Sequence, residues 1–224
     1  MSTVRPRPQL DLSLYLVLDP DLCGGAAGMV DTARVAAQNG ASVVQLRAPN
    51  WKKRQWYACA LELKRVLAPL GVPLIINDQV DVALAVDADG VHVGQSDLPA
   101  DAVRRLIGPH KWLGLSVSDA AELAAVPAHG VDHLGSGPVF ATATKGDAAP
   151  ATGLPLLAEL CAASRLPVVA IGGIGLTNCA SVVRCGADGV AVVSAICGQG
   201  DVAASTRALR GVVDTARRQG VRAP

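Results

Sequence analysis

The sequence predicts an α/β protein that folds as a single (β/α)8 TIM barrel. Short apolar runs and helical patterns alternate eight times along the 224 residues, with mostly short connections. Alternation of this kind implies a parallel sheet covered by helices, and eight units at this length fit a compact barrel. Half of the residues are apolar but only 3% are aromatic, so aliphatic side chains must fill the core, as in buried parallel strands. An open doubly wound sheet is the less favoured alternative, because no G-x-G-x-x-G fingerprint follows the first expected strand.

Each expected strand is a short apolar run, and most runs end at a polar residue or a glycine. The strands are expected at residues 14–18, 42–46, 74–76, 91–93, 112–117, 131–135, 167–171 and 189–193. Apolar residues at helical spacing predict the helices. The helices are expected at residues 28–39, 51–70, 80–86, 101–107, 119–125, 154–163, 177–184 and 201–218. Asp119 and Thr177 are the expected N-caps of the helices that they open.

Domain organisation, composition and charge narrow the class of protein. We expect residues 1–224 to form one domain, with residues 1–11 as a disordered N-terminal extension. The net charge is +1, so no broad basic surface is expected to attract nucleic acid or an anionic membrane. The apolar run at residues 12–18 is too short for a signal-peptide core, and no run approaches the roughly 18 apolar residues of a membrane span. We therefore expect a cytoplasmic protein that acts on small molecules, in an oligomeric state that the sequence does not specify.

The six cysteines form no C-x-x-C pair, and most fall inside apolar helical patterns. Cysteine behaves there as a small hydrophobic residue. We therefore expect free thiols, with neither a disulfide nor a cysteine metal site.

Polar residues that follow the expected strands should meet at one rim, because all strands of such a barrel point the same way. The first of these groups are Gln45 and Arg47, Asn77 and Asp78, Gln95 and Asp97, and Ser116 and Ser118. Asp78 and Asp97 follow neighbouring strands, and two converging carboxylates suit a hard cation such as Mg²⁺, which also bridges to phosphate. The alternative is that both aspartates are turn or helix N-cap residues.

Phosphate groups are the second kind of ligand that the sequence predicts. Residues 171–175, IGGIG, follow the seventh strand and precede a helix, where backbone N–H groups suit an anion. Ser194 follows the eighth strand with a hydroxyl group. The loop after the sixth strand, residues 137–153, carries three groups suited to phosphate oxygens: Thr142, Thr144 and Lys145. The rim therefore offers a diphosphate site at the two carboxylates and a monophosphate site at the glycine loop.

The sequence shows no residue pattern typical of an activated nucleophile with an adjacent base. His92 lies inside the fourth expected strand and His133 in the first part of the sixth, where packing or supporting roles are expected. A site rich in phosphate ligands and poor in acid–base groups suits a metal-assisted substitution in which diphosphate leaves.

Seven stretches of the chain resemble the thiamine-phosphate synthase (thiamine-phosphate pyrophosphorylase) family in order and spacing. They are YLVLD, VVQLR, LIINDQVDVALAVDADGVHVGQSDLP, LGLSVS, GPVFATATK, PVVAIGGI and GVAVVSAI, between Tyr15 and Ile196. The resemblance implies condensation of hydroxymethylpyrimidine diphosphate with a thiazole monophosphate. In this family diphosphate departs first, and the thiazole nitrogen captures the resulting pyrimidine cation.

The resemblance also implies roles for individual residues. Asp78 and Asp97 would bind Mg²⁺, the expected cofactor, and Ser116 and Lys145 would be catalytic. The residues implied to face the pyrimidine diphosphate are Gln45, Arg47, Asn77, Ser116 and Lys145. Those implied to face the thiazole phosphate are Thr142, Thr144, Gly173, Val193 and Ser194.

Two positions depart from the family pattern. Pro49 stands where the family has the lysine of Q-L-R-x-K, and either Lys52 or Lys53 could replace that lysine. His133 stands where the family commonly has tyrosine. Two alternatives stay open: a thiazole tautomerase paralogue on the same barrel, and a non-catalytic thiazole-phosphate-binding regulatory protein. The intact TATK motif and both aspartates favour the synthase.

Overall fold

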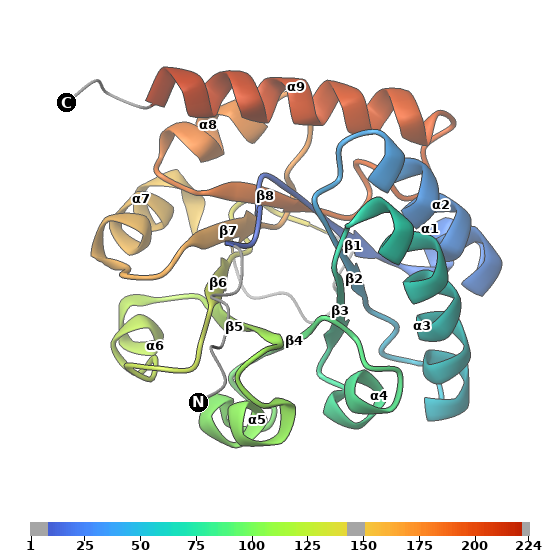
Figure 1. The fold of residues 1–224 in the computed structure, drawn as a ribbon. Coiled ribbons are helices and arrows are strands. Elements are labelled where there is room, and N and C mark those ends of the chain that lie inside the picture. The colour runs from blue at the N-terminus through green and yellow to red at the C-terminus, as the bar shows by residue number, and fades with distance from the viewer. Residues whose placement is uncertain (1–8, 143–150, 221–224) are drawn as a thin grey trace, which may run out of the picture.

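Eight parallel strands close into a barrel, as the sequence predicts (Figure 1). The structure is a computed structural model that describes residues 9–142 and 151–220. Each strand pairs in parallel with the next one along the chain, and β8 pairs with β1. The strands are β1 Leu14–Leu18, β2 Val43–Leu46, β3 Leu74–Asn77, β4 Gly90–Val93, β5 Trp112–Val117, β6 His133–Ser136, β7 Val168–Ile171 and β8 Gly189–Val192. The predicted (β/α)8 barrel is therefore confirmed.

The helices surround the barrel, and most lie within a few residues of their predicted positions (Figure 1). They are α1 Pro20–Cys23, α2 Ala26–Gln38, α3 Lys53–Leu67 with the 3-10 turn η1 Ala68–Leu70, α4 Val80–Ala85, α5 Ala100–Ile107, α6 Ala120–Ala124, α7 Gly153–Ala163, α8 Cys179–Arg184 and α9 Val202–Gly220. The single-turn helix α1 was not expected. Asp19 opens it by accepting hydrogen bonds from the N–H groups of Asp21 and Leu22.

One of the two predicted N-caps is confirmed. The Asp119 side chain accepts a hydrogen bond from the N–H of Glu122 at 2.8 Å and so caps α6. The prediction for Thr177 is wrong, because α8 begins at Cys179 and Asn178 occupies its N-cap position. Asn178 occupies this position, and its side chain makes two hydrogen bonds to the glycine loop that precedes the helix.

Buried apolar side chains lie on both sides of the strands. The larger cluster fills the space between strands and helices and includes Leu16 and Trp56. The smaller cluster lies inside the barrel and includes Val43 and Ile75. Alternate residues of a strand face the same side, so the inward side chain on β2 changes from Val43 to Gln45 as the strand reaches the rim. The barrel interior is thus apolar at its base and polar where a ligand would meet it.

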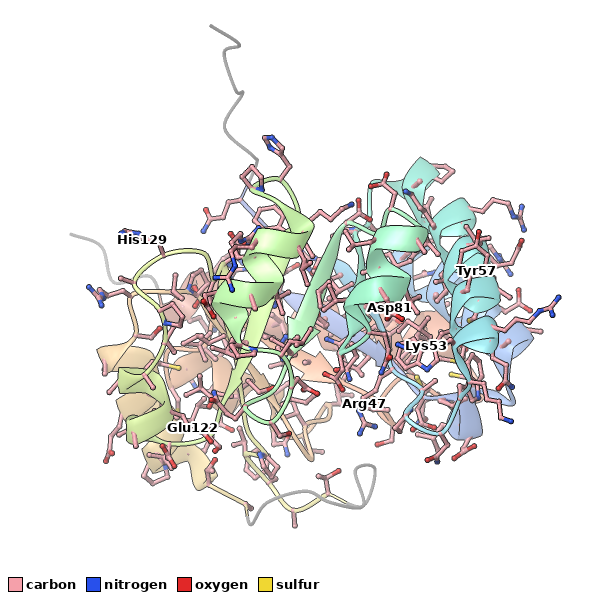
Figure 2. All side chains as sticks on the ribbon, turned by 90° about the horizontal axis from the view of Figure 1, so that it is seen from below. Arg47, Lys53, Tyr57, Asp81, Glu122 and His129 are labelled. Atoms are coloured by element: carbon pink, nitrogen blue, oxygen red, sulfur yellow. The ribbon has the colours of Figure 1, made fainter. Side chains whose placement is uncertain are left out.

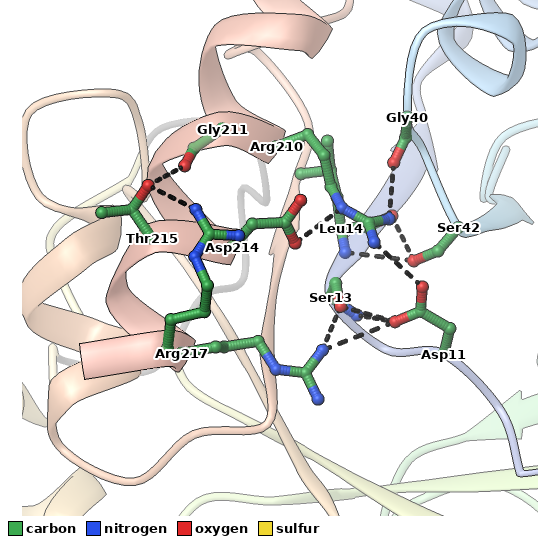
Figure 3. Close-up of polar contacts among 11 residues, drawn as sticks. Asp11, Ser13, Leu14, Gly40, Ser42, Arg210, Gly211, Asp214, Thr215 and Arg217 are labelled. Atoms are coloured by element: carbon green, nitrogen blue, oxygen red, sulfur yellow. Dashed lines mark hydrogen bonds and ion pairs between the residues drawn. The ribbon is translucent and has the colours of Figure 1, made fainter. Parts of the chain in front are cut away.

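Asp11 ties the start of the described chain to α9 at the amino end of the barrel (Figure 3). Its carboxylate accepts hydrogen bonds from the N–H and Oγ of Ser13 at 3.0 and 2.5 Å, and it pairs with Arg210 and Arg217 at 3.3 and 3.5 Å. Burial opposes ionisation of Asp11, but these hydrogen bonds and charges lower its pKa overall. Of the expected extension at residues 1–11, the first eight residues lie outside the described part of the chain.

All six cysteines are free thiols, as predicted. Within residues 9–142 and 151–220, no helix has both the length and the apolar character needed to cross a membrane.

Candidate functional site

Asp78 leaves β3 in a backbone conformation that residues with side chains seldom adopt. Its φ is 57°, in the left-handed region, and its N–H donates to the carbonyl of His92 on β4 at 2.8 Å. Its carboxylate accepts a hydrogen bond from Nδ2 of Asn77 at 2.6 Å. The helix-cap alternative for Asp78 is wrong, because Gln79 occupies the N-cap position of α4. Backbone strain of this kind recurs at functional sites.

Asp97 closes the turn that follows β4. Its Oδ2 accepts a hydrogen bond from the N–H of Gly94 at 2.8 Å, and Gln95 in the same turn donates to the carbonyl of Ser116 at 2.7 Å. Asp97 is therefore a turn residue and not a helix cap, since Pro99 holds the N-cap position of α5. Because β3 and β4 are neighbours, the turns that carry the two aspartates leave the barrel at the same rim.

The aspartate pair is not part of a complete cage of protein ligands. Among the residues that the structure describes, no three His, Cys, Asp or Glu side chains are grouped so as to hold a metal ion. A cation at Asp78 and Asp97 would take its other ligands from water or substrate oxygens. Mg²⁺ commonly binds in that way, through one or two carboxylates and phosphate oxygens.

Gln45 and Ser116 are each held by a side chain from inside the barrel. Gln45 is buried and donates from Nε2 to the Tyr15 hydroxyl at 2.9 Å. The Ser116 hydroxyl lies 3.0 Å from Nε2 of His92. Burial raises the pKa of Tyr15 far above its ordinary value, so this hydroxyl stays neutral. These contacts fix the amide and the hydroxyl that the sequence assigns to the pyrimidine.

Lys53 places positive charge beside residues that follow β3. Lys53 of α3 donates from Nζ to Oδ1 of Asp81 at 2.7 Å and also to the side chain of Gln79. Its hydrogen bond lowers the pKa of Asp81. Arg47, which follows β2, lies below Lys53 and Asp81 in Figure 2. Of the two candidate replacements for the family lysine, Lys53 is the one with described contacts to residues after β3, while Pro49 is exposed.

A cavity of about 690 Å³ opens across the barrel from the aspartates, at the ends of β6, β7, β8 and β1. Its lining comes from all four strand ends: Asp19, Asp21, Leu22, Ala141, Thr142, Gly173, Ile174, Gly175, Thr177, Asn178, Ser194 and Ala195. The structure thus brings together Thr142, Gly173 and Ser194, as the sequence predicts. Val193 instead packs, partly buried, against the barrel interior. Thr144 and Lys145 lie outside the described residues.

The loop after β7 needs its glycines because the loop after β6 packs directly on it. Gly172 and Gly173 have φ values of 102° and 62°. A Cβ atom on Gly172 would lie 2.5 Å from Cα of Pro138, and one on Gly173 would lie 2.6 Å from the carbonyl oxygen of Ala141. This close approach brings Thr142, in the β6 loop, to the cavity.

Asn178 fixes this glycine loop, and the sequence analysis missed it. Its Oδ1 accepts a hydrogen bond from the N–H of Gly175 at 2.8 Å, and its Nδ2 donates to the carbonyl of Gly173 at 2.9 Å. An asparagine just before a helix is a common cap, and that signal could have found it. Asp19 and Asp21 in the cavity wall were also missed, because α1 is too short to give a periodic pattern.

Comparison with known proteins agrees with this geometry. A family model described as thiamine monophosphate synthase matches residues 14–196, well over half of the chain. The chain belongs to the thiamine monophosphate synthase family. A thiamine-phosphate synthase from Laribacter hongkongensis is 58% identical over 203 residues, which cover 91% of this chain and 96% of that relative. One from Xanthobacter autotrophicus is 53% identical over 213 residues, which cover 95% of this chain and 100% of that relative.

Solved structures agree with the family assignment. A thiamine phosphate pyrophosphorylase from Pyrococcus furiosus superposes with a TM-score of 0.83 at 35% identity, covering 92% of this chain and 98% of that one. A 3-hexulose-6-phosphate synthase, at 18% identity and a TM-score of 0.67, shares the fold alone. As a member of the thiamine monophosphate synthase family, this chain is a transferase that forms thiamine phosphate from small molecules.

Proposed function

We propose that this transferase condenses hydroxymethylpyrimidine diphosphate with a thiazole monophosphate and releases diphosphate. The division of the rim into two halves supports this proposal most strongly. Asp78 and Asp97 follow β3 and β4, whereas the 690 Å³ cavity lies across the barrel at β7 and β8. The first half suits a metal-bound diphosphate and the second a monophosphate. Gln45 and Ser116 lie between them at the top of the barrel interior.

The carboxylate half would bind the leaving group. Asp78 and Asp97 would hold Mg²⁺, and their donor set fits this ion, because two hard carboxylates leave coordination positions for phosphate oxygens. When bound, Mg²⁺ would neutralise charge on the departing diphosphate. Arg47 would add positive charge on the same side, as Lys145 would from the loop after β6. Lys53, which pairs with Asp81, would add to it when a phosphate oxygen replaces that carboxylate.

The reacting carbon would lie between the two halves. The bond from the pyrimidine methylene carbon to the diphosphate oxygen breaks, and its electron pair leaves with the diphosphate. The thiazole nitrogen then donates its lone pair to the resulting cation. Ser116 and His92 have the spacing of a nucleophile and a base. A dissociative reaction requires neither role, so Ser116 is assigned to bind and orient the pyrimidine, together with Gln45 and Asn77.

The half of the rim that contains the cavity would bind the second substrate, the thiazole monophosphate. Thr142, Gly173 and Ser194 line the cavity and supply hydroxyl and backbone N–H groups for a monophosphate. In barrels, the loops after strands seven and eight frequently bind phosphate. Val193, and Thr144 from the loop after β6, complete the set that the family resemblance assigns to this substrate.

Diphosphate release from the purified protein tests the proposal. The protein is mixed with both substrates and Mg²⁺, and parallel reactions omit either the thiazole phosphate or the metal ion. Release that requires both substrates and Mg²⁺ is the expected result. No release in the complete mixture, together with isomerisation of a thiazole phosphate tautomer, would refute the synthase assignment.

The structure weakens the support for the two alternatives. The thiazole tautomerase and the non-catalytic binding protein both depend on departures from the family pattern, and a tautomerase needs no diphosphate site. One departure, His133, is only 1% exposed inside the barrel, which keeps it away from substrates at the rim. The other, Pro49, is followed four residues later by Lys53, whose side chain contacts Gln79 and Asp81 after β3.

A further inference from the structure

Interior side chains form a polar layer just below the proposed pyrimidine site. His92, Gly114 and His133 are aligned on β4, β5 and β6, so the glycine lies between the two histidines. The two imidazole centroids are 5.8 Å apart, and the ring of Tyr15 packs against His133 with a centroid distance of 6.1 Å. Tyr15 and His92 are the residues that hold Gln45 and Ser116. Both supports therefore contact the same buried histidine.

Two glycines make room for the His92 ring. A Cβ atom on Gly114 would lie 2.3 Å from Nδ1 of His92 and 2.5 Å from Nε2 of His133. A Cβ atom on Gly135, which pairs with Ser116, would lie 2.9 Å from Cε1 of His92. Real Cβ atoms do not approach other atoms so closely, so only glycine at these positions accommodates the ring. The backbone of two strands thus determines where Nε2 of His92 points.

His133 is a neutral support for this ring. Neither of its ring nitrogens has a hydrogen-bond partner among the described residues, and the side chain is buried. Burial lowers the pKa of His133 to about 4, so the imidazole carries no charge at neutral pH. Buried polar atoms without partners are uncommon in folded proteins and are costly. An imidazole at this buried position therefore indicates a role in the polar layer beyond filling space.

We propose that His92 is a positioning residue for Ser116, with its Nε2 fixing the serine hydroxyl toward the pyrimidine and His133 holding the ring of His92 in place. The proposal rests on the proposed function, which assigns Ser116 to the pyrimidine diphosphate. Without Nε2 the hydroxyl can rotate among its staggered positions. A preset hydroxyl stabilises the positive charge that develops on the pyrimidine as diphosphate leaves, without the cost of ordering it. The binding of the diphosphate itself depends on other residues.

Because His92 acts on the Ser116 hydroxyl and other residues bind the diphosphate, replacing His92 should affect kcat more than KM. His92→Asn places its amide near the position of Nδ1, whereas His92→Gln places it near that of Nε2. His92→Asn is expected to lower kcat about 30-fold and to change KM for the pyrimidine diphosphate less than about threefold. His92→Gln should recover kcat to within about fivefold of wild type. His129→Asn, at an exposed position (Figure 2), is the matched control and should change neither constant.

A double-mutant cycle tests whether His92 acts through Ser116. In a Ser116→Ala background, His92→Asn should cause no further loss of kcat. An equal loss in both backgrounds, or full activity of His92→Asn, would overturn the proposal and leave the proposed function intact if the wild type releases diphosphate. Absence of release by the wild type would instead overturn the proposed function, and this proposal with it.

Nitrogen-15 NMR of the imidazole rings gives a second measurement that does not depend on turnover or on the folding of a His92 variant. Ser116→Ala should shift the Nε2 signal of His92. Ser118→Ala is the matched control, because the Ser118 hydroxyl bonds to Glu122 at 2.7 Å and should leave that signal in place. An unchanged His92 signal in Ser116→Ala would overturn the proposal.

Discussion

Replacing His133 by phenylalanine is expected to make the protein less sensitive to mild acid. His133 is 1% exposed, and burial lowers the pKa of its imidazole from 6.5 to about 4. The unfolded chain therefore binds a proton at this residue near pH 6.5, whereas the folded chain binds it only near pH 4. The contribution of the neutral imidazole to stability is complete above pH 6.5 and is lost as the pH falls from 6.5 through 4. Phenylalanine keeps the ring contacts to Tyr15 and His92 but takes up no proton.

The size of the effect follows from the linkage between proton binding and unfolding. Each pH unit in which only the unfolded chain is protonated lowers the free energy of unfolding by about 1.4 kcal/mol. The loss between pH 6.5 and pH 5 is therefore about 2 kcal/mol, and the loss over the whole interval down to pH 4 is about 3 kcal/mol. Even the smaller value is a large fraction of the stability of a typical domain.

Urea unfolding of the wild type and His133→Phe at pH 7.5 and pH 5 measures this effect. The free energy of unfolding of the variant, relative to wild type, should rise by about 2 kcal/mol on going to the lower pH. His129→Phe, exposed in Figure 2, is the matched control and should show no such rise. The comparison cancels acid effects that are common to both proteins. An equal difference at both pH values would refute the reasoning, because the folded protein would then accommodate the imidazolium.

Three further predictions concern the two halves of the rim. Asp78→Asn should lower Mg²⁺-dependent diphosphate release at least about 100-fold, because the amide is a poor ligand for a hard cation; an unchanged Mg²⁺ titration would contradict the metal assignment. Lys53→Ala should raise KM for the pyrimidine diphosphate about tenfold, as measured by steady-state kinetics. Arg54→Ala, which changes an exposed neighbour on the same helix, is the control and should leave this KM unchanged. Asn178→Ala should raise KM for the thiazole phosphate about tenfold, because the glycine loop loses two hydrogen bonds. Leu176→Ala, at a half-exposed position in the same loop, should leave this KM unchanged. Equal KM values for the two variants would show that the loop keeps its shape without Asn178.

Local patterns in the sequence were sufficient to predict the barrel. Each strand is buried on both faces, so it reads as a continuous apolar run regardless of its neighbours. The predicted strand boundaries were less accurate where the pairing between strands determines them. The sixth strand was expected from residue 131 but begins at His133, because Asp132 uses its side chain to bind Arg104 and the N–H of Leu113. The helix α1 was missed because its four residues contain no periodic pattern.

The sequence by itself also determined which residues reach the rim, because every strand of a parallel barrel ends there. Only the tertiary structure decided how those residues are held. Asp78 takes a left-handed conformation where it leaves β3, and its N–H bonds to the carbonyl of His92 on the neighbouring strand. Ser116 is set by His92, 24 residues away, and that contact exists only because Gly114 leaves space for the ring. Such contacts join residues that are far apart in the chain through the pairing of neighbouring strands, and no local pattern records them.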